Sequence, residues 1–297
     1  MFINQNDDFY SMFKWYGKLG ILLVLFAEIN FVLKIEPFAR WYFPIIWFGY
    51  IFIIDAINYK ISKKSLLMTD KKHFFIMLIL STFFWITFEI INQYISNWQY
   101  NTVDVFKSNI EKGLFALLSF STVLPAIFET YFLIQNTNLF NHRKLKHKHN
   151  ITKRFLHIMY LIGIICLISP IIFPKFTFPL VWASFFFLLD PINYLHKKPS
   201  IISHLKDRNL KIPLSLMLAG LITGFFWEFW NYYAIPKWFY NIPYVSFFKI
   251  FEMPILGYLG YLPFALELYA MYYFFTQTLH DEEIKIFKLI KNKSSIN

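Results

Sequence analysis

Eight apolar stretches, each long enough to cross a lipid bilayer, constrain the fold of this sequence more than any other feature. A transmembrane helix needs about 20 predominantly apolar residues. The stretches are Trp15–Leu33, Tyr42–Tyr59, Phe74–Ile95, Leu114–Ile134, Phe155–Phe173, Phe178–Leu195, Ile212–Ala234 and Ile255–Thr276. With 57% apolar and 16% charged residues, the 297-residue chain has more apolar surface than a soluble core can bury. We expect an all-α polytopic membrane protein with eight transmembrane helices, and neither a soluble enzyme nor a nucleic-acid-binding protein.

The basic residues are concentrated in alternate loops. Of the 29 lysines and arginines, 22 lie near the two termini and in the loops around residues 60–72, 143–154 and 197–211. Cytoplasmic loops of membrane proteins are enriched in these residues. We therefore expect both termini to be cytoplasmic, in a cell or inner membrane, and the basic loops to contact anionic lipid.

The second half of the chain repeats polar residues of the first half at an offset of 135 to 141 positions. The matched residues are Asp55 and Asp190, Asn58 and Asn193, Glu89 and Glu228, Asn92 and Asn231, Trp98 and Trp238, Tyr100 and Tyr240, Glu111 and Glu252, and Glu129 and Glu267. A biased apolar composition does not generate polar identities of this kind. We predict two domains, residues 1–150 and 151–297, each with four helices. Because four is an even number, the two repeats have the same orientation, about an axis along the membrane normal.

Seven carboxyl groups lie within the predicted spans, where no lysine or arginine is well buried. They are Glu28, Asp55, Glu89, Glu129, Asp190, Glu228 and Glu267. At roughly 2.5 to 3.5 kcal/mol for each charge near mid-membrane, seven lipid-facing anions would cost about 20 kcal/mol. That exceeds a typical folding stability of roughly 5 to 15 kcal/mol. We expect most of them to face the bundle interior, some as neutral acids because burial disfavours the charged form.

Glu228 and Glu267 are the leading candidates for acid/base chemistry. Glutamine would hold helices together equally well without the cost of burying a carboxyl group. Trp227 and Trp230 flank Glu228 and have no tryptophan counterparts beside Glu89. The second half is therefore predicted to carry the chemistry, and the first half to support it.

The remaining candidates are acids and amides on matched helices. Asn231 lies three residues after Glu228, on the same helical face, and is predicted to orient it. Asp190 and Asn193 have the same spacing and are predicted to form a supporting polar pair. An alternative interpretation is that such residues only form interhelical hydrogen bonds, at about 0.6 kcal/mol each. The complete set of candidate site residues is Glu89, Glu129, Asp190, Asn193, Glu228, Asn231 and Glu267.

Other residues have predicted structural roles. Trp98 and Trp238 lie just outside their helices and are predicted to anchor the protein at the lipid interface. Gly220 and Gly224 form a small-xxx-small pair, which predicts close helix packing. Pro125 and Pro263 are predicted to kink their helices.

Carboxylic acids in an aromatic, water-poor interior suit the protonation of a carbon–carbon double bond in a lipid. A neutral acid supplies the proton, aromatic faces stabilise the cation, and a second carboxylate removes a proton elsewhere. The sequence contains no nucleophile motif, phosphate-binding loop or metal-ligand spacing, so we expect no cofactor and no metal. The expected reaction is isomerisation or cyclisation of a hydrophobic lipid substrate within the bilayer.

The duplication resembles the membrane-bound lycopene cyclases of the heterodimeric bacterial and fungal type, which consist of two tandem copies of a small three-helix domain. The similar features are the Asp helix, the W-x-Y segment and a Pro followed by Glu in each repeat, PAIFETYF and PFALELYAMYYF. The resemblance implies a linear carotenoid or other polyprenoid substrate, with Glu129 and Glu267 as the motif acids. That family carries Pro-x-Glu-Glu, whereas each copy here has one acid, so lycopene cyclisation and another isoprenoid transformation both remain open.

Two other functions are compatible with the sequence. Internal repeats and intramembrane acids also occur in proton-coupled transporters and lipid carriers. A scaffold or assembly factor would explain the helices but not the matched acids.

Overall fold

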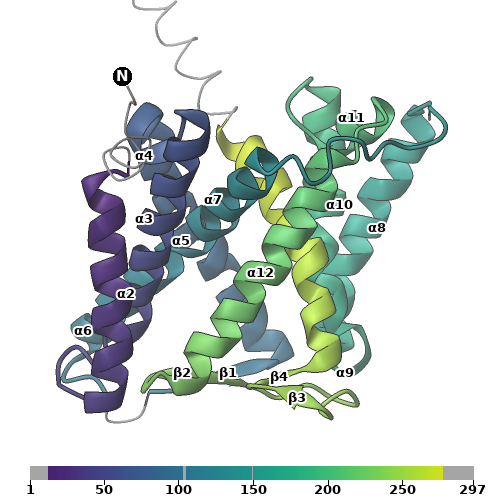
Figure 1. Ribbon diagram of the computed structural model, residues 1–297. Helices are drawn as coiled ribbons and strands as arrows, with labels where there is room; N and C mark the ends of the chain where they lie inside the picture. Colours follow the sequence, from purple (N-terminus) through teal and green to yellow (C-terminus); the bar gives the residue numbers. More distant parts are fainter. Residues whose placement is uncertain (1–12, 103–104, 149, 277–297) are drawn as a thin grey trace, which may run out of the picture.

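The computed structural model describes residues 13–102, 105–148 and 150–276, which form a helical bundle closed at one end by short strands (Figure 1). In this part of the chain, seven helical segments are long and apolar enough to cross a membrane, and α6 and α7 together count as one of them. This finding confirms the prediction of an all-α chain whose helices are long and apolar enough to cross a membrane. The elements in chain order are α2 (Trp15–Leu33), α3 (Tyr42–Ser62), α4 (Leu66–Thr69), α5 (Lys71–Ile95), β1 (Trp98–Asn101), α6 (Asn109–Ser121), α7 (Val123–Asn136), α8 (Lys153–Ile172), α9 (Pro174–Thr177), the 3₁₀ helix η1 (Phe178–Leu180), α10 (Val181–Leu195), α11 (Ile201–Lys206), α12 (Lys211–Tyr233), β2 (Lys237–Tyr240), β3 (Lys249–Ile250), β4 (Met253–Pro254), the 3₁₀ helix η2 (Ile255–Gly260) and a helix over residues 261–276.

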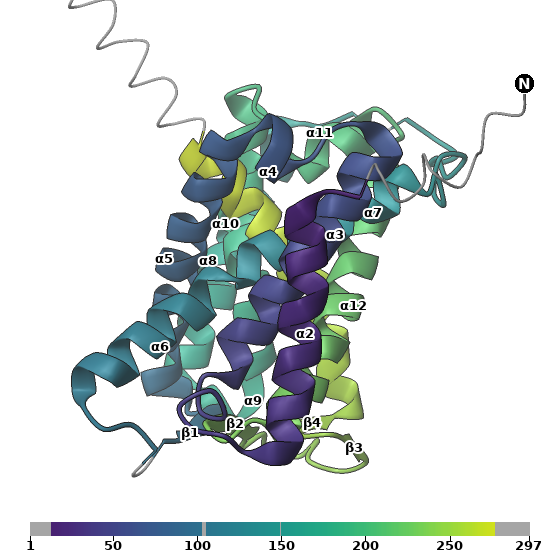
Figure 2. The same cartoon turned by 60° about the vertical axis from the view of Figure 1, so that its left-hand side comes forward.

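Helix α3 lies inside the bundle, whereas α2 and α8 lie on its outside. The apolar part of α3 is 67% buried within the protein, compared with 28% for α2 and for α8. Figure 2 shows α2 packed along α3, and in the second half α8 packs along α10 in the same way. Contacts between α7 and α12 join the two halves. Helices α2 and α8 are thus apolar all round and little buried within the protein.

The two ends of the bundle differ in character. The short helices α4 and α11 and the basic loops lie at one end, at the top of Figure 1. The strands lie at the other end, where β1 pairs antiparallel with β2. This pairing places Trp98 opposite Tyr240, and Tyr100 opposite Trp238. The two W-x-Y segments that repeat in the sequence therefore lie side by side.

The fourth predicted span is interrupted between α6 and α7, at Thr122, three residues before Pro125. Ser81 of α5 bridges the interruption, because its hydroxyl donates to the Phe120 carbonyl (2.5 Å) and accepts from the Leu124 N–H (2.9 Å). In a continuous helix these two backbone groups would bond to each other. The predicted kink at Pro125 is confirmed, and α6 leaves the bundle at an angle (Figure 2).

Gly220 and Gly224 bring α12 close to the helix over residues 261–276. A Cβ atom at Gly220 would lie 2.3 Å from the carbonyl oxygen of Tyr261, and one at Gly224 would lie 2.3 Å from the Tyr261 ring. The prediction of close packing at this pair is confirmed. Gly224 also determines where the Tyr261 ring lies.

Gly224→Ala is expected to lower the free energy of unfolding by about 1 to 3 kcal/mol, because the Tyr261 ring must move. Gly113→Ala in α6 is the matched control, since a Cβ atom there meets no atom within 4 Å. Alanine at such a helical position should stabilise by about 0.5 to 1 kcal/mol. Denaturant unfolding of the purified proteins in micelles measures both changes. Equal effects at the two positions would contradict this explanation.

Candidate functional site

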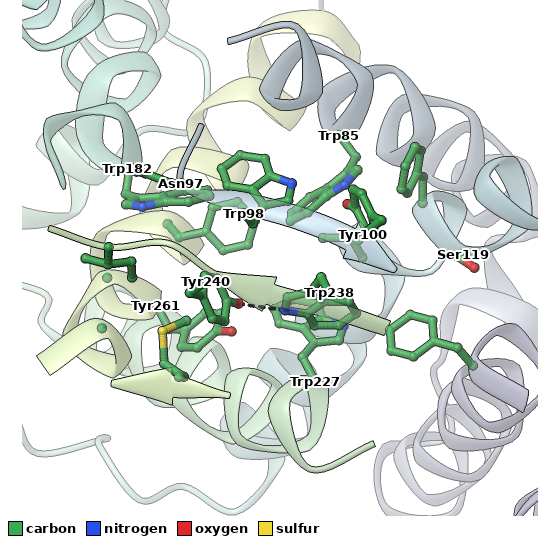
Figure 3. A pocket seen from close by; sticks show the side chains of 18 of the residues that line it. Trp85, Asn97, Trp98, Tyr100, Ser119, Trp182, Trp227, Trp238, Tyr240 and Tyr261 are labelled. Carbon is green, nitrogen blue, oxygen red and sulfur yellow. Dashed lines mark hydrogen bonds between the residues drawn. The ribbon is translucent and has the colours of Figure 1, made fainter. Parts of the chain in front are cut away.

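A cavity of about 420 Å³ lies at the strand end of the bundle. Helices α5, α6, α10 and α12, strands β1 and β2, and the helix over residues 261–276 contribute to its wall (Figure 3). The wall is mostly aromatic and contains five of the nine tryptophans. These are Trp85, Trp98, Trp182, Trp227 and Trp238. Concave sites of this size with apolar walls are typical binding sites for small ligands.

Ring contacts hold the tryptophans of the wall in place. The ring centroid of Trp98 lies 5.7 Å from that of Trp182 and 6.2 Å from that of Trp85. Trp98 is only 4% exposed, and Trp238 lines the same cavity. The prediction that Trp98 anchors the protein at the lipid interface is therefore wrong, whereas Trp238 is half-buried and its anchoring role stays a prediction. The pairing of β1 with β2 places both side chains in the cavity wall.

Glu228 is fully buried behind this wall. Its Oε1 atom accepts hydrogen bonds from the hydroxyl groups of Tyr240 and Tyr261, each at 2.6 Å, and both tyrosines line the cavity. The indole N–H of Trp238 donates to the Tyr240 hydroxyl (2.8 Å; Figure 3). The Oε2 atom of Glu228 is buried and has no hydrogen-bond partner among the described residues. The two tyrosines thus connect a buried carboxyl group to the cavity.

Tyr240 keeps its proton at neutral pH. Burial raises the pKa of Tyr240 well above its usual range, and the neighbouring Glu228 carboxyl group raises it further. The Tyr240 hydroxyl is therefore a hydrogen-bond donor to Glu228 under physiological conditions.

Glu89 has a comparable position in the first half. Its Oε1 atom accepts hydrogen bonds from the indole N–H groups of Trp85 (2.9 Å) and Trp98 (3.1 Å) and from the Tyr100 hydroxyl. All three donors line the cavity. Two carboxyl groups, one from each half, therefore lie behind the same aromatic wall.

Asn231 contacts the strand rather than Glu228. Its side chain accepts from the Trp238 N–H (2.8 Å) and donates to the Trp238 carbonyl (2.7 Å). Asn92 binds the Trp98 backbone in the same way, at 3.3 and 2.8 Å. The prediction that Asn231 orients Glu228 directly is wrong, because the backbone beyond the end of α12 offers both a donor and an acceptor to the amide. Asn231 instead fixes β2, which carries Tyr240.

Asp190 and Asn193 do not form the predicted polar pair. The Asp190 carboxylate is fully buried and accepts from the backbone N–H groups of Ile201 (2.8 Å) and Ile202 (2.9 Å) at the start of α11. Asn193 donates to the Ala270 carbonyl (2.9 Å). The first N–H groups of a helix have no partner within the helix and attract a carboxylate, which explains the difference.

Asp55 has the same role at α4 in the first half. It accepts from the Leu67 N–H (2.9 Å) and from the Tyr16 hydroxyl (2.5 Å). Both aspartates therefore hold short helices at the basic-loop end, opposite the cavity (Figure 1).

Glu129 and Glu267 are fully buried but do not line the cavity. Glu129 accepts from the Asn58 amide (2.8 Å). Glu267 accepts from the Ser184 hydroxyl (3.2 Å) and the Phe185 N–H (2.7 Å). Each has its second oxygen buried without a hydrogen-bond partner in the part of the chain that the structure describes. The two glutamates match in sequence but have different polar neighbours.

The structure thus brings together only some of the predicted site residues. Glu228, Asn231 and Glu89 belong to the cavity end, whereas Asp190 and Asn193 lie at the opposite end of α10. Sequence reasoning missed most of the cavity wall, although the repeated W-x-Y segments were a signal for part of it. The missed residues include Trp85, Tyr100, Lys112, Ser119, Trp182, Tyr240 and Tyr261.

Comparison with known proteins gives no relative from which a function could be transferred. No protein-family model matches the sequence, and searches of curated proteins and of solved structures give no significant match.

Proposed function

We propose that this chain is an integral membrane enzyme that isomerises or cyclises an isoprenoid lipid without a cofactor, with Glu228 as the acid. One observation carries the proposal: the buried Glu228 carboxyl group is connected to an aromatic cavity by Tyr240 and Tyr261. Protonation of a double bond needs a positioned acid and a site that stabilises a cation, and aromatic faces provide the latter.

The proposed architecture is eight transmembrane helices in two parallel repeats, residues 1–150 and 151–297. The helix over residues 261–276, drawn in yellow in Figure 1, runs from the strand end to the basic-loop end and would be the eighth crossing. The shared roles of Asn92 with Asn231, and of Asp55 with Asp190, support the duplication. The antiparallel pairing of β1 with β2 also supports it, because a two-fold axis along the membrane normal relates strands in this way.

The proposed orientation places the basic-loop end in the cytoplasm, with both termini, and the cavity at the opposite membrane surface. It rests on the lysines and arginines of the loops joined to α4 and α11. Anionic lipid would contact these loops.

In the proposed reaction a double bond of the substrate lies against Tyr240 and Tyr261. One tyrosine hydroxyl turns from Glu228 to the double bond and gives it a proton, while the neutral Glu228 carboxyl group turns its own O–H to that tyrosine and replaces the proton. A C–H bond forms, Glu228 becomes a carboxylate, and a carbocation remains on the substrate. In a cyclisation, a second double bond attacks this cation and forms the ring C–C bond. Loss of a proton from a neighbouring carbon to the Glu89 carboxylate, through Tyr100, then forms the new double bond and leaves the atom count of the substrate unchanged. Proton exchange with solvent reprotonates Glu228 and deprotonates Glu89 before the next turnover.

A linear carotenoid is the substrate class that the resemblance to lycopene cyclases implies. The acids matched by that resemblance, Glu129 and Glu267, lie outside the cavity wall. Glu228 and Glu89 lie directly behind it. We therefore assign the proton donor to Glu228, and keep Glu267 as the second candidate.

The test is expression in a host that accumulates lycopene, with its pigments and lipids separated by chromatography and identified by mass. The expected result is an isomeric or ring-bearing product that is absent from the host with an empty vector. A matched host that accumulates shorter isoprenoids tests the wider substrate class. Unchanged isoprenoids in both hosts, with the protein present in the membrane, would contradict the proposed function.

Proton-coupled transport is the second candidate function. It is favoured by three carboxyl groups, on three different helices, that each keep one buried oxygen without a partner in the described part of the chain. These are Glu129, Glu228 and Glu267. Purified protein in vesicles with an internal pH dye distinguishes the functions. Isoprenoid conversion without proton uptake is expected, and substrate-dependent proton uptake without a new product would favour transport.

A further inference from the structure

Two polar side chains of α6 line the mostly aromatic wall of the cavity. Ser119 is 6% exposed and lines the cavity, and its hydroxyl has no hydrogen-bond partner in the described ranges. Lys112 lines the same cavity seven residues earlier and is exposed at its rim. Seven residues are two helical turns, or about 10 Å, so both side chains lie on one face of α6. A buried hydroxyl without a partner is costly unless a ligand satisfies it.

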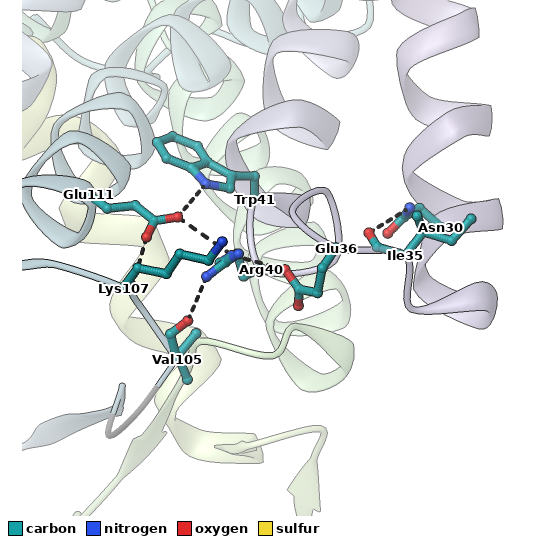
Figure 4. Close-up of polar contacts among 8 residues, drawn as sticks. All are labelled: Asn30, Ile35, Glu36, Arg40, Trp41, Val105, Lys107 and Glu111. Atoms are coloured by element: carbon teal, nitrogen blue, oxygen red, sulfur yellow. Dashed lines mark hydrogen bonds and ion pairs between the residues drawn. The ribbon is translucent and has the colours of Figure 1, made fainter.

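The Lys112 ammonium group is available for a ligand. The nearby Glu111 carboxylate is occupied by other groups: it accepts from the Trp41 indole N–H (3.2 Å) and the Lys107 backbone N–H (2.8 Å) (Figure 4). The Arg40 guanidinium group lies 3.5 Å from Glu111 and compensates its charge. The Lys112 ammonium group itself has no ion pair or hydrogen bond within the described part of the chain.

A second hollow adjoins the rim of the cavity at the start of α6. It shares Thr102, Phe106 and Lys112 with the main cavity, and Lys107, Ser108 and Asn109 complete its lining. The lining thus changes from aromatic to basic and polar as the cavity reaches the membrane surface. An uncharged hydrocarbon would leave both Lys112 and Ser119 without a partner.

We propose that the cavity takes an amphipathic isoprenoid-type lipid whose anionic head group binds Lys112 at the rim, with Ser119 bonding an oxygen further along the lipid. The proposal rests on the proposed function, because it specifies the substrate class of the same cavity. The apolar chain lies among the five tryptophans of the wall, and its double bonds reach Tyr240 and Tyr261. An anionic head paired with Lys112 would also fix which double bond faces Glu228.

The test measures binding without requiring turnover. Five of the nine tryptophans line the cavity, so quenching of tryptophan fluorescence reports its occupation. The probes are geranyl, farnesyl and geranylgeranyl phosphates, each compared with the corresponding alcohol, in nanodiscs of zwitterionic lipid. We expect the phosphate that fits best to bind about tenfold tighter than its alcohol, the effect of one charge-assisted hydrogen bond.

Lys112→Gln should remove this preference for phosphate and leave binding of the alcohol unchanged. Ser119→Ala should weaken binding of the phosphate and of the alcohol, each by a smaller factor. The carboxylic acid with the same isoprenoid chain is a further probe, which distinguishes recognition of any anion from recognition of phosphate. Lys249→Gln in β3 is the matched control, because Lys249 is exposed at the same end of the bundle and does not line the cavity. It should keep the full preference.

Each outcome supports or overturns the proposal. Equal binding of phosphate and alcohol by the wild type, a preference that survives in Lys112→Gln, or binding of neither lipid would overturn it. Conversion of a hydrocarbon in the host experiment, together with no preference for phosphate, would keep the proposed function and reject this inference. A preference for phosphate that depends on Lys112, without any product in the host experiment, would support this inference and reject the proposed function.

Discussion

Glu228→Gln is expected to lower product formation by about 10²- to 10⁴-fold, the usual contribution of a positioned acid. The glutamine amide oxygen can still accept the hydrogen bonds of Tyr240 and Tyr261, so the cavity wall should keep its shape. The variant loses the proton that the substrate requires. Product formation per folded protein, measured by chromatography with mass detection, therefore reports the chemical role separately from folding.

Two matched variants make this result specific. Glu267→Gln also changes a fully buried glutamate, but one that contacts Ser184 and Phe185 and not the cavity wall, so a smaller loss is expected. Glu252→Gln removes a carboxylate at the strand end that pairs with Lys237 (2.6 Å) and does not line the cavity, so a much smaller loss than for Glu228→Gln is expected. If Glu267→Gln were the more damaging variant, the proton donor would be Glu267. Full activity in both glutamine variants would reject acid catalysis by either residue.

Tyrosine variants test how the proton reaches the cavity. Tyr240 and Tyr261 both donate to the same oxygen of Glu228, so either one can serve when the other is missing. Tyr240→Phe and Tyr261→Phe should each cause a partial loss, and the double variant should approach Glu228→Gln. If the two single variants each lost little product formation and the double variant lost only the sum of these effects, the tyrosines would shape the cavity without transferring the proton.

Helix positions could be predicted from the sequence because they depend on local properties. Long apolar runs form helices wherever they lie, and the start of α2 and the end of α5 were predicted to the residue. The interruption before Pro125 was also predictable, since proline cannot continue a helix without losing a backbone hydrogen bond. Its compensation by Ser81 was not, because Ser81 comes from another helix and joins the broken ends only through tertiary packing.

The candidate site was harder to predict because the hydrogen-bond partners of its polar groups depend on the tertiary structure. The i, i+3 spacing placed Asn231 near Glu228 on one helical face, but a free backbone just beyond the helix end attracts the amide more strongly. Pairing of β1 with β2 turns Trp98 from an apparent surface anchor into cavity wall and places Trp238 in the same wall, and nothing local to either segment encodes that pairing. The matched acids indicated which helices matter, without indicating that their partners would be tyrosines and indoles.

Asp190→Ala is expected to lower the free energy of unfolding by about 2 to 6 kcal/mol. Removing the carboxylate leaves the N–H groups of Ile201 and Ile202 buried without an acceptor, and each such group costs roughly 1 to 3 kcal/mol. Denaturant unfolding in micelles, followed by tryptophan fluorescence, measures the loss. Activity per folded molecule should stay unchanged, because Asp190 lies at the end of the bundle opposite the cavity.

Graded variants separate this capping role from a general effect of altering a buried acid. Asp190→Asn keeps one acceptor oxygen and should lose about half as much stability, whereas Ser200→Ala removes only the side-chain bond to the Ser203 N–H and should cost about 1 kcal/mol. Asp55→Ala should behave like Asp190→Ala, with one N–H group of α4 and the Tyr16 hydroxyl left unpaired. If Asp190→Ala had the same free energy of unfolding as the wild type but formed no product, Asp190 would have a role in the reaction and not a structural role. A stability loss shared by both aspartates, with activity retained, would mean that the repeated Asp helix holds the short helices of each half in place and that the repeated glutamates serve the cavity.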